Sequence, residues 1–282
     1  MSIFSGSFLA VLVGFYDDSL NAKGKDLSPY IRFFTNIICA ILVVASGIKI
    51  YFVTNPFGGI LPLTMPLLSL GFATITFADI VTVVWIVWVM NMLNWSKGVD
   101  GQMPGIVGVS AIIIGLLSIR TAGNQFGLLD AHLSFIIAGV SFGFLLYNFY
   151  PAKIFPGYGA TALYFLLAVV SILSSAKLAT ALLVMGIPTI DAIFTIVRRI
   201  LSGRSPFWHD NRHLHHILLR LGLSQRTIAL SYWLFSAILG TISLSLESRS
   251  KFFALSMLAA IVGGTLLFLH FILRKDDETV NT

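Results

Sequence analysis

The sequence predicts an all-α fold, a polytopic bundle of transmembrane helices, from its composition and from the length of its apolar runs. Of its 282 residues, 57% are hydrophobic and only 11% are charged, and the mean hydropathy is +0.90. In soluble domains roughly a quarter of all residues are charged, so this composition excludes an ordinary soluble protein. Several apolar runs approach the ~20 residues that a helix needs to cross a bilayer.

Nine such runs follow one another, so we expect about nine membrane spans. They cover residues 3–16, 32–53, 79–95, 105–119, 133–149, 160–176, 178–197, 227–246 and 252–273. Residues 1–273 are therefore expected to form one integral membrane domain, followed by a cytoplasmic tail over 274–282. The uncharged segment 54–64, punctuated by Pro and Gly, is typical of an external loop or a short hairpin.

The basic residues predict the orientation. With the N-terminus outside, 13 of the 18 Lys and Arg fall in cytoplasmic segments and five on the opposite side. Because cytoplasmic loops carry the excess of Lys and Arg, we expect N-out and C-in, in the inner (plasma) membrane, with an active-site cleft on the cytoplasmic side. The one cysteine, Cys39, excludes an intramolecular disulfide and a site of several thiolates.

Asp17 and Asp18 end the first apolar run, where acidic residues oppose the helix dipole. A carboxylate in this position is typical of a metal ligand or of a group that accepts a proton from a phosphate or hydroxyl. The alternative is a solvated loop in which Lys23 and Lys25 balance the two charges. The pair alone does not decide between these interpretations.

A second motif follows the third apolar run. Asn91 and Asn94 lie three residues apart, on one helical face, where amides at the end of a span need partners or a ligand. Two glycines then allow a tight backbone around Lys97 and Asp100, and such a loop can bind a nucleotide or a sugar. The alternative is an amide clamp between helices, followed by an ordinary turn.

The most basic segment runs from Arg198 to Arg226 and holds six arginines, four histidines and one acidic residue. Asp210 is expected to cap, and Gly222 to end, a helix over residues 211–221. Asp191 lies within the preceding apolar run. A carboxylate in that position faces the protein interior, so we expect it to pair with an Arg or a His.

The histidines of this helix are expected to bind an anion. His213 and His216 would share one flank with Arg220, with His215 to the side, around a helix N-terminus that favours anions. Arg204 adds a bidentate donor, so a diphosphate is the expected guest. A histidine metal site is less favoured because carboxylate or thiolate companions are missing nearby. A merely basic, membrane-facing loop is the other alternative.

The motifs occur in a characteristic order. They are Gly14-x-x-Asp17-Asp18, Asn91-x-x-Asn94-x-x-Lys97-Gly-x-Asp100-Gly, Asn148-x-x-Pro151-Ala-Lys153-Ile-Phe, Gly186-x-Pro188-x-x-Asp191 and Arg204-Ser-Pro-Phe-x-x-Asp210-x-x-His213-Leu-His-His216. In this order the chain resembles the polyprenyl-phosphate N-acetylhexosamine-1-phosphate transferases of glycosyltransferase family 4. These include the enzymes that begin lipid-linked O-antigen (lipopolysaccharide), teichoic-acid and peptidoglycan synthesis in the cell envelope.

The resemblance implies a reaction and its partners. An oxygen of a polyprenyl phosphate attacks the β-phosphorus of a UDP-N-acetylhexosamine, which gives polyprenyl-diphospho-sugar and UMP. The implied partners are the polyprenyl phosphate, the UDP-sugar and the surrounding membrane lipid, with no nucleic acid. Dimers occur among such enzymes, so a homodimer belongs to the expectation.

Site residues follow by position in the motifs. Asp17 and Asp18 would be the catalytic pair, one of them accepting the proton of the lipid phosphate. Asn94 would lie beside Mg²⁺, the implied cofactor. The residues implied to bind substrate are Asn91, Asn94, Lys97, Asp100, Lys153, Arg204, His213, His215 and His216.

Three features depart from the family pattern. Lys97 stands where the bacterial family usually has the first Asp of Asp-Gly-x-Asp-Gly, and Tyr158 stands where it has a metal-binding Asp. A neutral phenol cannot replace a carboxylate as a ligand of Mg²⁺. We therefore hypothesise that the ammonium of Lys97 partly takes the metal's place as a fixed cation. The chain also begins later than family members, which usually carry two or more spans before the Asp pair.

These departures leave two further hypotheses open. The chain could be a catalytically inactive relative that binds lipid phosphate or a nucleotide-sugar and assists a partner. It could also be a transporter for an anionic solute. Transporters commonly show repeat symmetry and polar groups at the midplane, whereas here no repeat is visible and the polar motifs gather on one face.

Overall fold

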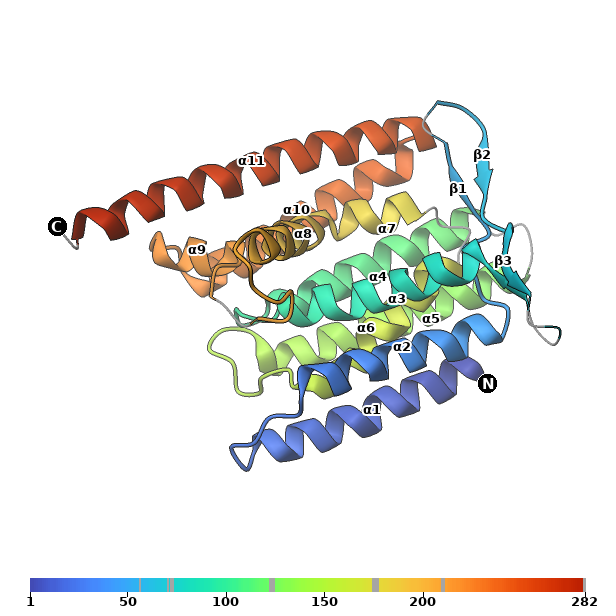
Figure 1. Ribbon diagram of the computed structural model, residues 1–282, viewed down its shortest axis with the longest axis horizontal. Coiled ribbons are helices and arrows are strands. Elements are labelled where there is room, and N and C mark those ends of the chain that lie inside the picture. Colours follow the sequence, from blue (N-terminus) through green and yellow to red (C-terminus); the bar gives the residue numbers. More distant parts are fainter. Residues whose placement is uncertain are drawn as a thin grey trace.

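The computed structural model describes residues 1–55, 57–69, 71, 74–121, 125–173, 178–208 and 211–280, with the stretches 125–127 and 273–280 described by their backbone alone. Most helices run roughly side by side along the molecule (Figure 1). The N-terminus and two small hairpins lie at one end of this bundle, and the C-terminus lies at the other.

The elements alternate along the chain between long helices and short connections. The helices are α1 (Ser2–Asn21), α2 (Pro29–Ala45), α3 (Phe77–Trp95), α4 (Gln102–Thr121), α5 (Gln125–Asn148), α6 (Thr161–Leu173), α7 (Leu178–Val184), α8 (Gly186–Leu201), α9 (Leu214–Arg220), α10 (Gln225–Ser245) and α11 (Ser248–Val280), with a 3-10 turn η1 (Tyr158–Ala160) before α6. The strands are β1 (Phe52–Thr54), β2 (Ile60–Pro62), β3 (Pro66–Ser69) and β4 (Thr74–Thr76).

Within the described residues, six helices are long and apolar enough to cross a membrane, namely α1, α3, α4, α5, α10 and α11. The pair α7 and α8 passes the same test together, while α2 and the segment Tyr158–Leu173 are shorter apolar helices. Each of the nine expected runs thus overlaps with a helix or a helix pair, although α2 ends at Ala45 and the run expected over 32–53 finishes in β1. The chain is a multi-pass helical membrane protein, as the sequence predicted. The number of spans and their direction stay predictions.

Two antiparallel hairpins connect α2 to α3. Strand β1 pairs with β2 and strand β3 with β4, both at the N-terminal end of the bundle (Figure 1). The first hairpin agrees with the short hairpin expected over residues 54–64, whose external position stays a prediction, and the second hairpin was not predicted. At the start of α3, Asp79 and Thr76 form a capping box, and the Asp79 carboxylate also accepts a bond from Lys49 at 2.6 Å.

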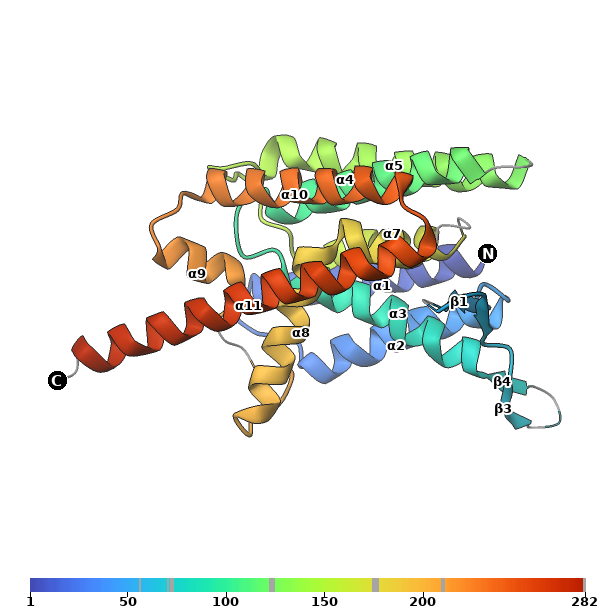
Figure 2. The ribbon, with the colours of Figure 1, turned by 90° about the horizontal axis from the view of Figure 1, so that it is seen from above.

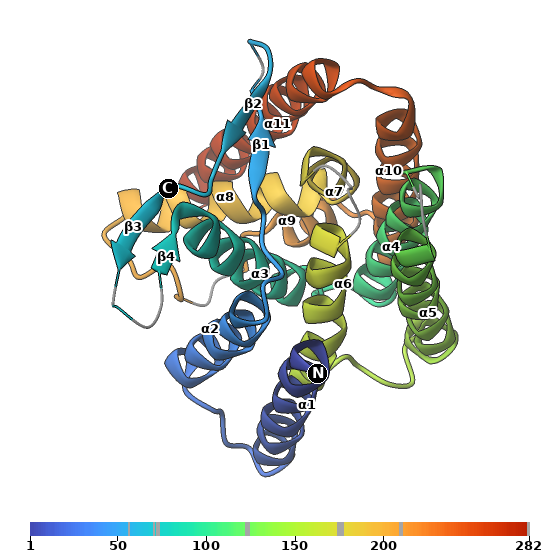
Figure 3. The ribbon, with the colours of Figure 1, turned by 90° about the vertical axis from the view of Figure 1, so that its right-hand side faces the viewer.

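α1, α2, α3 and α6 lie next to one another in the view along the helices (Figure 3). α4 is largely buried within the bundle, whereas few residues of α11 between Ser248 and Ile272 are buried, so that this helix faces lipid in a membrane. The tail expected from residue 274 falls in the last turns of α11. The division into a membrane domain and a tail stays a prediction.

α7 and α8 meet at an angle of 84°, so that α8 leaves the common helix direction (Figure 2). The bend coincides with Gly186 and Pro188 at the start of α8. Proline lacks a backbone N–H and its ring clashes with the preceding turn, so a helix breaks or bends there. The bend places Asp191, in the second turn of α8, beside the segment that precedes α9.

The helix predicted over residues 211–221 is shorter in the structure. α9 begins at Leu214 and has His213 in its N-cap position, while Gly222, with φ of +87°, follows its last turn. Asp210, the predicted N-cap, lies outside the described residues. The start of α9 is instead held by Asp191, whose Oδ1 accepts a hydrogen bond from the Leu214 N–H at 2.8 Å. The prediction of the helix start was wrong by three residues, because a distant carboxylate takes up the N–H of Leu214, where the helix begins.

Candidate active site

The end of α1 lies directly against the turn that precedes α6. At Gly14 an added Cβ would meet the Gly159 backbone, and at Gly157 it would meet the Asp18 carboxylate. Only glycine lets these two backbones approach so closely. This approach carries Asp17 and Asp18 to the N-terminal end of η1.

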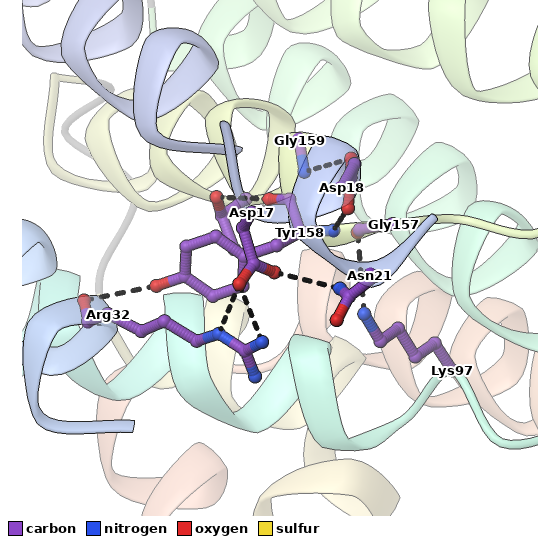
Figure 4. A network of polar contacts seen from close by, with 9 residues as sticks. Asp17, Asp18, Asn21, Arg32, Lys97, Gly157, Tyr158 and Gly159 are labelled. Atoms are coloured by element: carbon purple, nitrogen blue, oxygen red, sulfur yellow. Dashed lines mark hydrogen bonds and ion pairs between the residues drawn. The ribbon is translucent and has the colours of Figure 1, made fainter. Parts of the chain in front are cut away.

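The Asp18 carboxylate holds the η1 turn. Its Oδ1 accepts a hydrogen bond from the Tyr158 N–H at 2.6 Å, and its Oδ2 accepts one from the Gly159 N–H at 3.1 Å (Figure 4). These are N–H groups of the type that a helix start leaves without an internal partner. Asp18 therefore acts as a cap that comes from another part of the chain.

The Asp17 carboxylate is paired with Arg32 of α2. Its Oδ1 accepts bonds from Arg32 Nε at 3.0 Å and Nη2 at 2.6 Å, and its Oδ2 accepts one from Asn21 Nδ2 at 3.2 Å (Figure 4). Asp17 is only 1% exposed. The alternative of a solvated pair balanced by Lys23 and Lys25 is therefore wrong for Asp17, because α1 continues through Asn21 and buries this carboxylate against α2.

Lys97 approaches the same place from the loop after α3. Its Nζ donates to the Gly157 carbonyl at 3.4 Å, and the side chain is half-buried. Burial lowers the pKa of Lys97 to about 8, since the field of Asp18 raises the pKa less than burial lowers it. Near neutral pH the ammonium is therefore still charged, but it is close to its titration range.

Tyr158 fills the space between α1 and α2. The side chain is 4% exposed, and its hydroxyl donates toward the Arg32 carbonyl at 3.0 Å and Asn36 Oδ1 at 3.1 Å. The Arg32 guanidinium lies over the ring, 5.3 Å from its centre. The phenol is thus part of the packing that holds Arg32 in place.

These side chains line a pocket of about 440 Å³. Two cations and three carboxylates face it, of which Asp26 is exposed at the rim. The charged and amide residues of this pocket, which we call the Asp17–Lys97 pocket, are Asp17, Asp18, Asn21, Asp26, Arg32 and Lys97.

A second polar cluster lies around the start of α9. His213 Nδ1 donates to Asp191 Oδ2 at 2.8 Å, and the Thr195 hydroxyl lies 3.3 Å from the same nitrogen. Asp191 and His213 are each 5% exposed. The predicted pairing of Asp191 with an Arg or a His is confirmed. A merely basic, membrane-facing loop is wrong for His213, which is buried.

His215 is the most deeply buried histidine of this cluster, at 1% exposure. Its ring stacks on His213 with the centres 5.6 Å apart, and His216 lies 4.2 Å away. Neither ring nitrogen of His215 has a hydrogen-bond partner among the described residues. Burial, together with the two neighbouring histidines, lowers the pKa of His215 well below its usual value, so that the ring is neutral near pH 7.

The remaining predicted residues lie apart from the two clusters. Asn91 donates to the Val87 carbonyl one turn earlier in α3, and Asp100 Oδ2 accepts from the Ala152 N–H at 3.0 Å. Lys153 is exposed, and Arg204 is exposed with its guanidinium over the ring of Trp208. Nothing in the contacts of these four residues points to a ligand.

The residues near Lys97 do not fit the Mg²⁺ ion that the resemblance implies. The described residues contain no group of three or more His, Cys, Asp or Glu placed to hold a metal ion. Asn94 Oδ1 is a buried oxygen without a hydrogen-bond partner in the described part of the chain. Tyr158, at the position of the expected metal-binding Asp, donates its hydroxyl to Asn36 Oδ1 and offers no carboxylate ligand. Mg²⁺ requires several oxygen ligands in octahedral geometry, which this arrangement does not offer.

Four charged or amide residues of the Asp17–Lys97 pocket and its wall were not among the predicted site residues. They are Asn21, Asp26, Arg32 and Asn36. Arg32 entered the sequence analysis only as one of the cytoplasmic basic residues. A basic residue at the first turn of an apolar run, 15 positions after the first residue of an Asp pair, is the signal that could have identified it.

Comparison with known proteins agrees with this arrangement of motifs. The family model of glycosyl transferase family 4 matches residues 1–175, which include the Asp17–Lys97 pocket. The chain belongs to glycosyl transferase family 4. It is 30% identical over 266 residues to a probable undecaprenyl-phosphate N-acetylglucosaminyl 1-phosphate transferase of Bacillus subtilis, which covers 91% of this chain and 68% of the relative.

Two further members of the family show a similar degree of likeness. A decaprenyl-phosphate N-acetylglucosaminephosphotransferase of Mycobacterium tuberculosis is 29% identical over 89% of this chain and 66% of its own length. An undecaprenyl-phosphate alpha-N-acetylglucosaminyl 1-phosphate transferase of Haemophilus influenzae is 32% identical over 84% of this chain and 65% of its own length. The chain therefore spans about two thirds of the length of the curated relatives it matches.

Proposed function

We propose that this chain transfers N-acetylhexosamine-1-phosphate from a UDP-sugar to a polyprenyl phosphate and releases UMP. The observation that carries the proposal is the convergence of Lys97 and Arg32 on a pocket lined by Asp17, which is buried, and Asp18, in a chain of this family. Two cations at the end of a bundle with an apolar outer surface suit a phosphate attached to a lipid. The neutral ring of His215, whose nitrogens have no hydrogen-bond partner among the described residues, is a further donor that packs against the loop of Lys97.

The chemistry needs little help from a base. A phosphate monoester has its second pKa at about 6, so near pH 7 the lipid phosphate already carries an unprotonated nucleophilic oxygen. That oxygen forms a bond to the β-phosphorus, and the bond from this phosphorus to the oxygen that bridges the two phosphates breaks. UMP leaves with the electron pair of that bond.

The side chains of the pocket then act by position and charge, which dominate catalysis of phosphoryl transfer. Arg32 and Lys97 attract the phosphates, Asp17 orients Arg32, and Asp18 holds the η1 turn. The carboxylate oxygens of the Asp pair already accept five hydrogen bonds from this chain. The role of proton acceptor for one of them, implied by the resemblance, stays a prediction.

The test is release of UMP by the purified chain in detergent. A panel of UDP-N-acetylhexosamines would be offered with and without undecaprenyl phosphate, and Lys23→Ala would serve as a control at an exposed lysine outside the pocket. Release that depends on the lipid acceptor supports the proposal. Binding of UDP-sugar without release would favour an inactive relative, and uptake into vesicles without acceptor would favour a transporter.

For the orientation, we propose N-out and C-in across nine spans of the plasma (inner) membrane, with the Asp17–Lys97 pocket on the cytoplasmic side. The single native cysteine is buried, so introduced cysteines can be labelled selectively. Phe57→Cys, in the exposed turn of the first hairpin, should react with an impermeant maleimide in intact cells. Lys153→Cys should react only after the membrane is opened, and the reverse pattern would invert the topology.

A further inference from the structure

The Asp17–Lys97 pocket already contains its own positive charge. Arg32 lies on the Asp17 carboxylate at 2.6 Å, and the ammonium of Lys97 lies within the field of Asp18 and Asp17. The two inner carboxylates are thus matched by two fixed cations before any ion binds (Figure 4). A divalent cation would have to approach Arg32 and Lys97, and both would repel it.

The Asp pair is also occupied as a set of ligands. Three hydrogen bonds hold Asp17, and two main-chain N–H groups hold Asp18. Tyr158, the third side chain at this point, is committed as a donor to Asn36 and to the Arg32 carbonyl. Mg²⁺ would have to share these carboxylates with the Arg32 guanidinium and with the N–H groups of the η1 turn, which compete with it for the same oxygens.

The ammonium of Lys97 has donors left to bind an anion. An ammonium carries three N–H donors, and the described residues give Lys97 one long contact, to the Gly157 carbonyl at 3.4 Å. Its side chain is half-buried and lines the pocket. An ammonium in this state gains most from a ligand that brings acceptor oxygens and negative charge, which a phosphate does.

Resting on the proposed transfer reaction, we propose that Lys97 and Arg32 together replace the divalent metal, so that this chain binds the phosphates and transfers the sugar phosphate without a metal ion. The charge that develops on the phosphoryl oxygens is met by the ammonium and the guanidinium. Such preorganised charge is the main contribution of a site to this type of reaction. Tyr158, at the sequence position where the family has a metal ligand, then serves to keep Arg32 in place.

The first experiment is UMP release in excess EDTA and in added Mg²⁺, with undecaprenyl phosphate as acceptor. We expect equal release in both, a loss of about 10²–10³-fold in kcat for Lys97→Ala, as for removal of one oxyanion donor, and partial activity for Lys97→Arg. Release that occurs only with Mg²⁺ would overturn the inference and leave the proposed function standing.

A binding experiment separates the two proposals when no release is seen. Titration of wild type with UDP in EDTA should give a heat of binding that Lys97→Ala loses and Lys97→Arg retains. Binding of UDP only in the presence of Mg²⁺ would refute the inference. The converse variant, Lys97→Asp combined with Tyr158→Asp, adds two carboxylates to the pocket. It should bind Mn²⁺ in an EPR titration, and tight Mn²⁺ binding by the wild type would also refute metal replacement.

Discussion

The ring of His215 lies where a Cβ on residue 98 would be. Because Gly98 follows Lys97 directly, this contact joins the two polar clusters: Lys97 faces the Asp17–Lys97 pocket, while the next residue packs on the histidines of α9. The loop of Lys97 and Gly98 is thus in contact with both clusters. The position of Lys97 therefore depends on the next residue having no side chain.

Gly98→Ala should disrupt this arrangement. The added methyl group would collide with the imidazole of His215, which is confined by His213 and His216 on its other sides. Either the ring or the loop must shift, and a shift of about 1 Å at an active site can reduce the rate by about 10²-fold. We expect a loss of that size in UMP release, with a thermal unfolding midpoint close to that of wild type.

Gly139→Ala in α5 is the matched control, because a Cβ there meets nothing within 4 Å. It should retain wild-type activity. If Gly98→Ala were as active as Gly139→Ala, the packing of His215 on the loop would have no bearing on the reaction.

Most of the architecture follows from the length of the apolar runs, which is why each run overlaps with a helix or a helix pair. The pairing of Asp191 with His213 was predictable as well, because a carboxylate inside a span must find a partner. The start of α9 was not predictable from local capping residues. The N–H of its first residue, Leu214, bonds to Asp191, which lies 23 residues earlier and is brought there by the bend before α8.

The pocket itself was predicted in outline. Asp17, Asp18 and Lys97 were correctly expected to belong together, but the partners that decide their state come from far along the chain. Asp18 bonds to N–H groups 140 and 141 residues away, and no spacing rule links such positions. Lys153 and Arg204 are exposed, and their role in substrate binding stays a prediction, since a basic residue in a loop gives no indication of whether its side chain turns outward.

Activity should fall as the pH rises through about 8. The ammonium of Lys97 is the acid form, so its charged fraction drops from roughly nine-tenths at pH 7 to roughly a tenth at pH 9. The pH profile of kcat/KM reports the free enzyme and should show this basic limb. Lys97→Arg should remain active to higher pH, because a guanidinium does not titrate in this range. A flat wild-type profile to pH 9 would show that the charge of Lys97 is not required.

Removal of Arg32 should destabilise the protein as well as inactivate it. Arg32→Ala leaves the Asp17 carboxylate buried without its cation, and loss of one partner from a buried pair costs about 3–5 kcal/mol. We expect the lower part of that range, since the Arg32 side chain is 26% exposed. The unfolding midpoint in detergent measures the effect.

The double variant Asp17→Asn with Arg32→Ala separates stability from function. It removes the unpaired charge, so most of the lost stability should return, whereas UMP release should stay absent because the pocket has lost a cation. Recovery of activity together with stability would mean that Arg32 serves only to neutralise Asp17.

The neutral state of His215 should make the protein sensitive to acid. Its pKa in the folded chain lies below the unfolded value of about 6.5, so below that pH the unfolded chain binds a proton that the folded chain does not. Stability should therefore fall as the pH drops, by up to about 1.4 kcal/mol per pH unit for this one group. The unfolding midpoints of wild type and His215→Gln at pH 7.5 and 5.5 measure it. The difference between the two pH values should be smaller in His215→Gln, with His132→Gln as a control for loss of an exposed histidine. Equal differences in wild type and His215→Gln would mean that other groups carry the acid sensitivity.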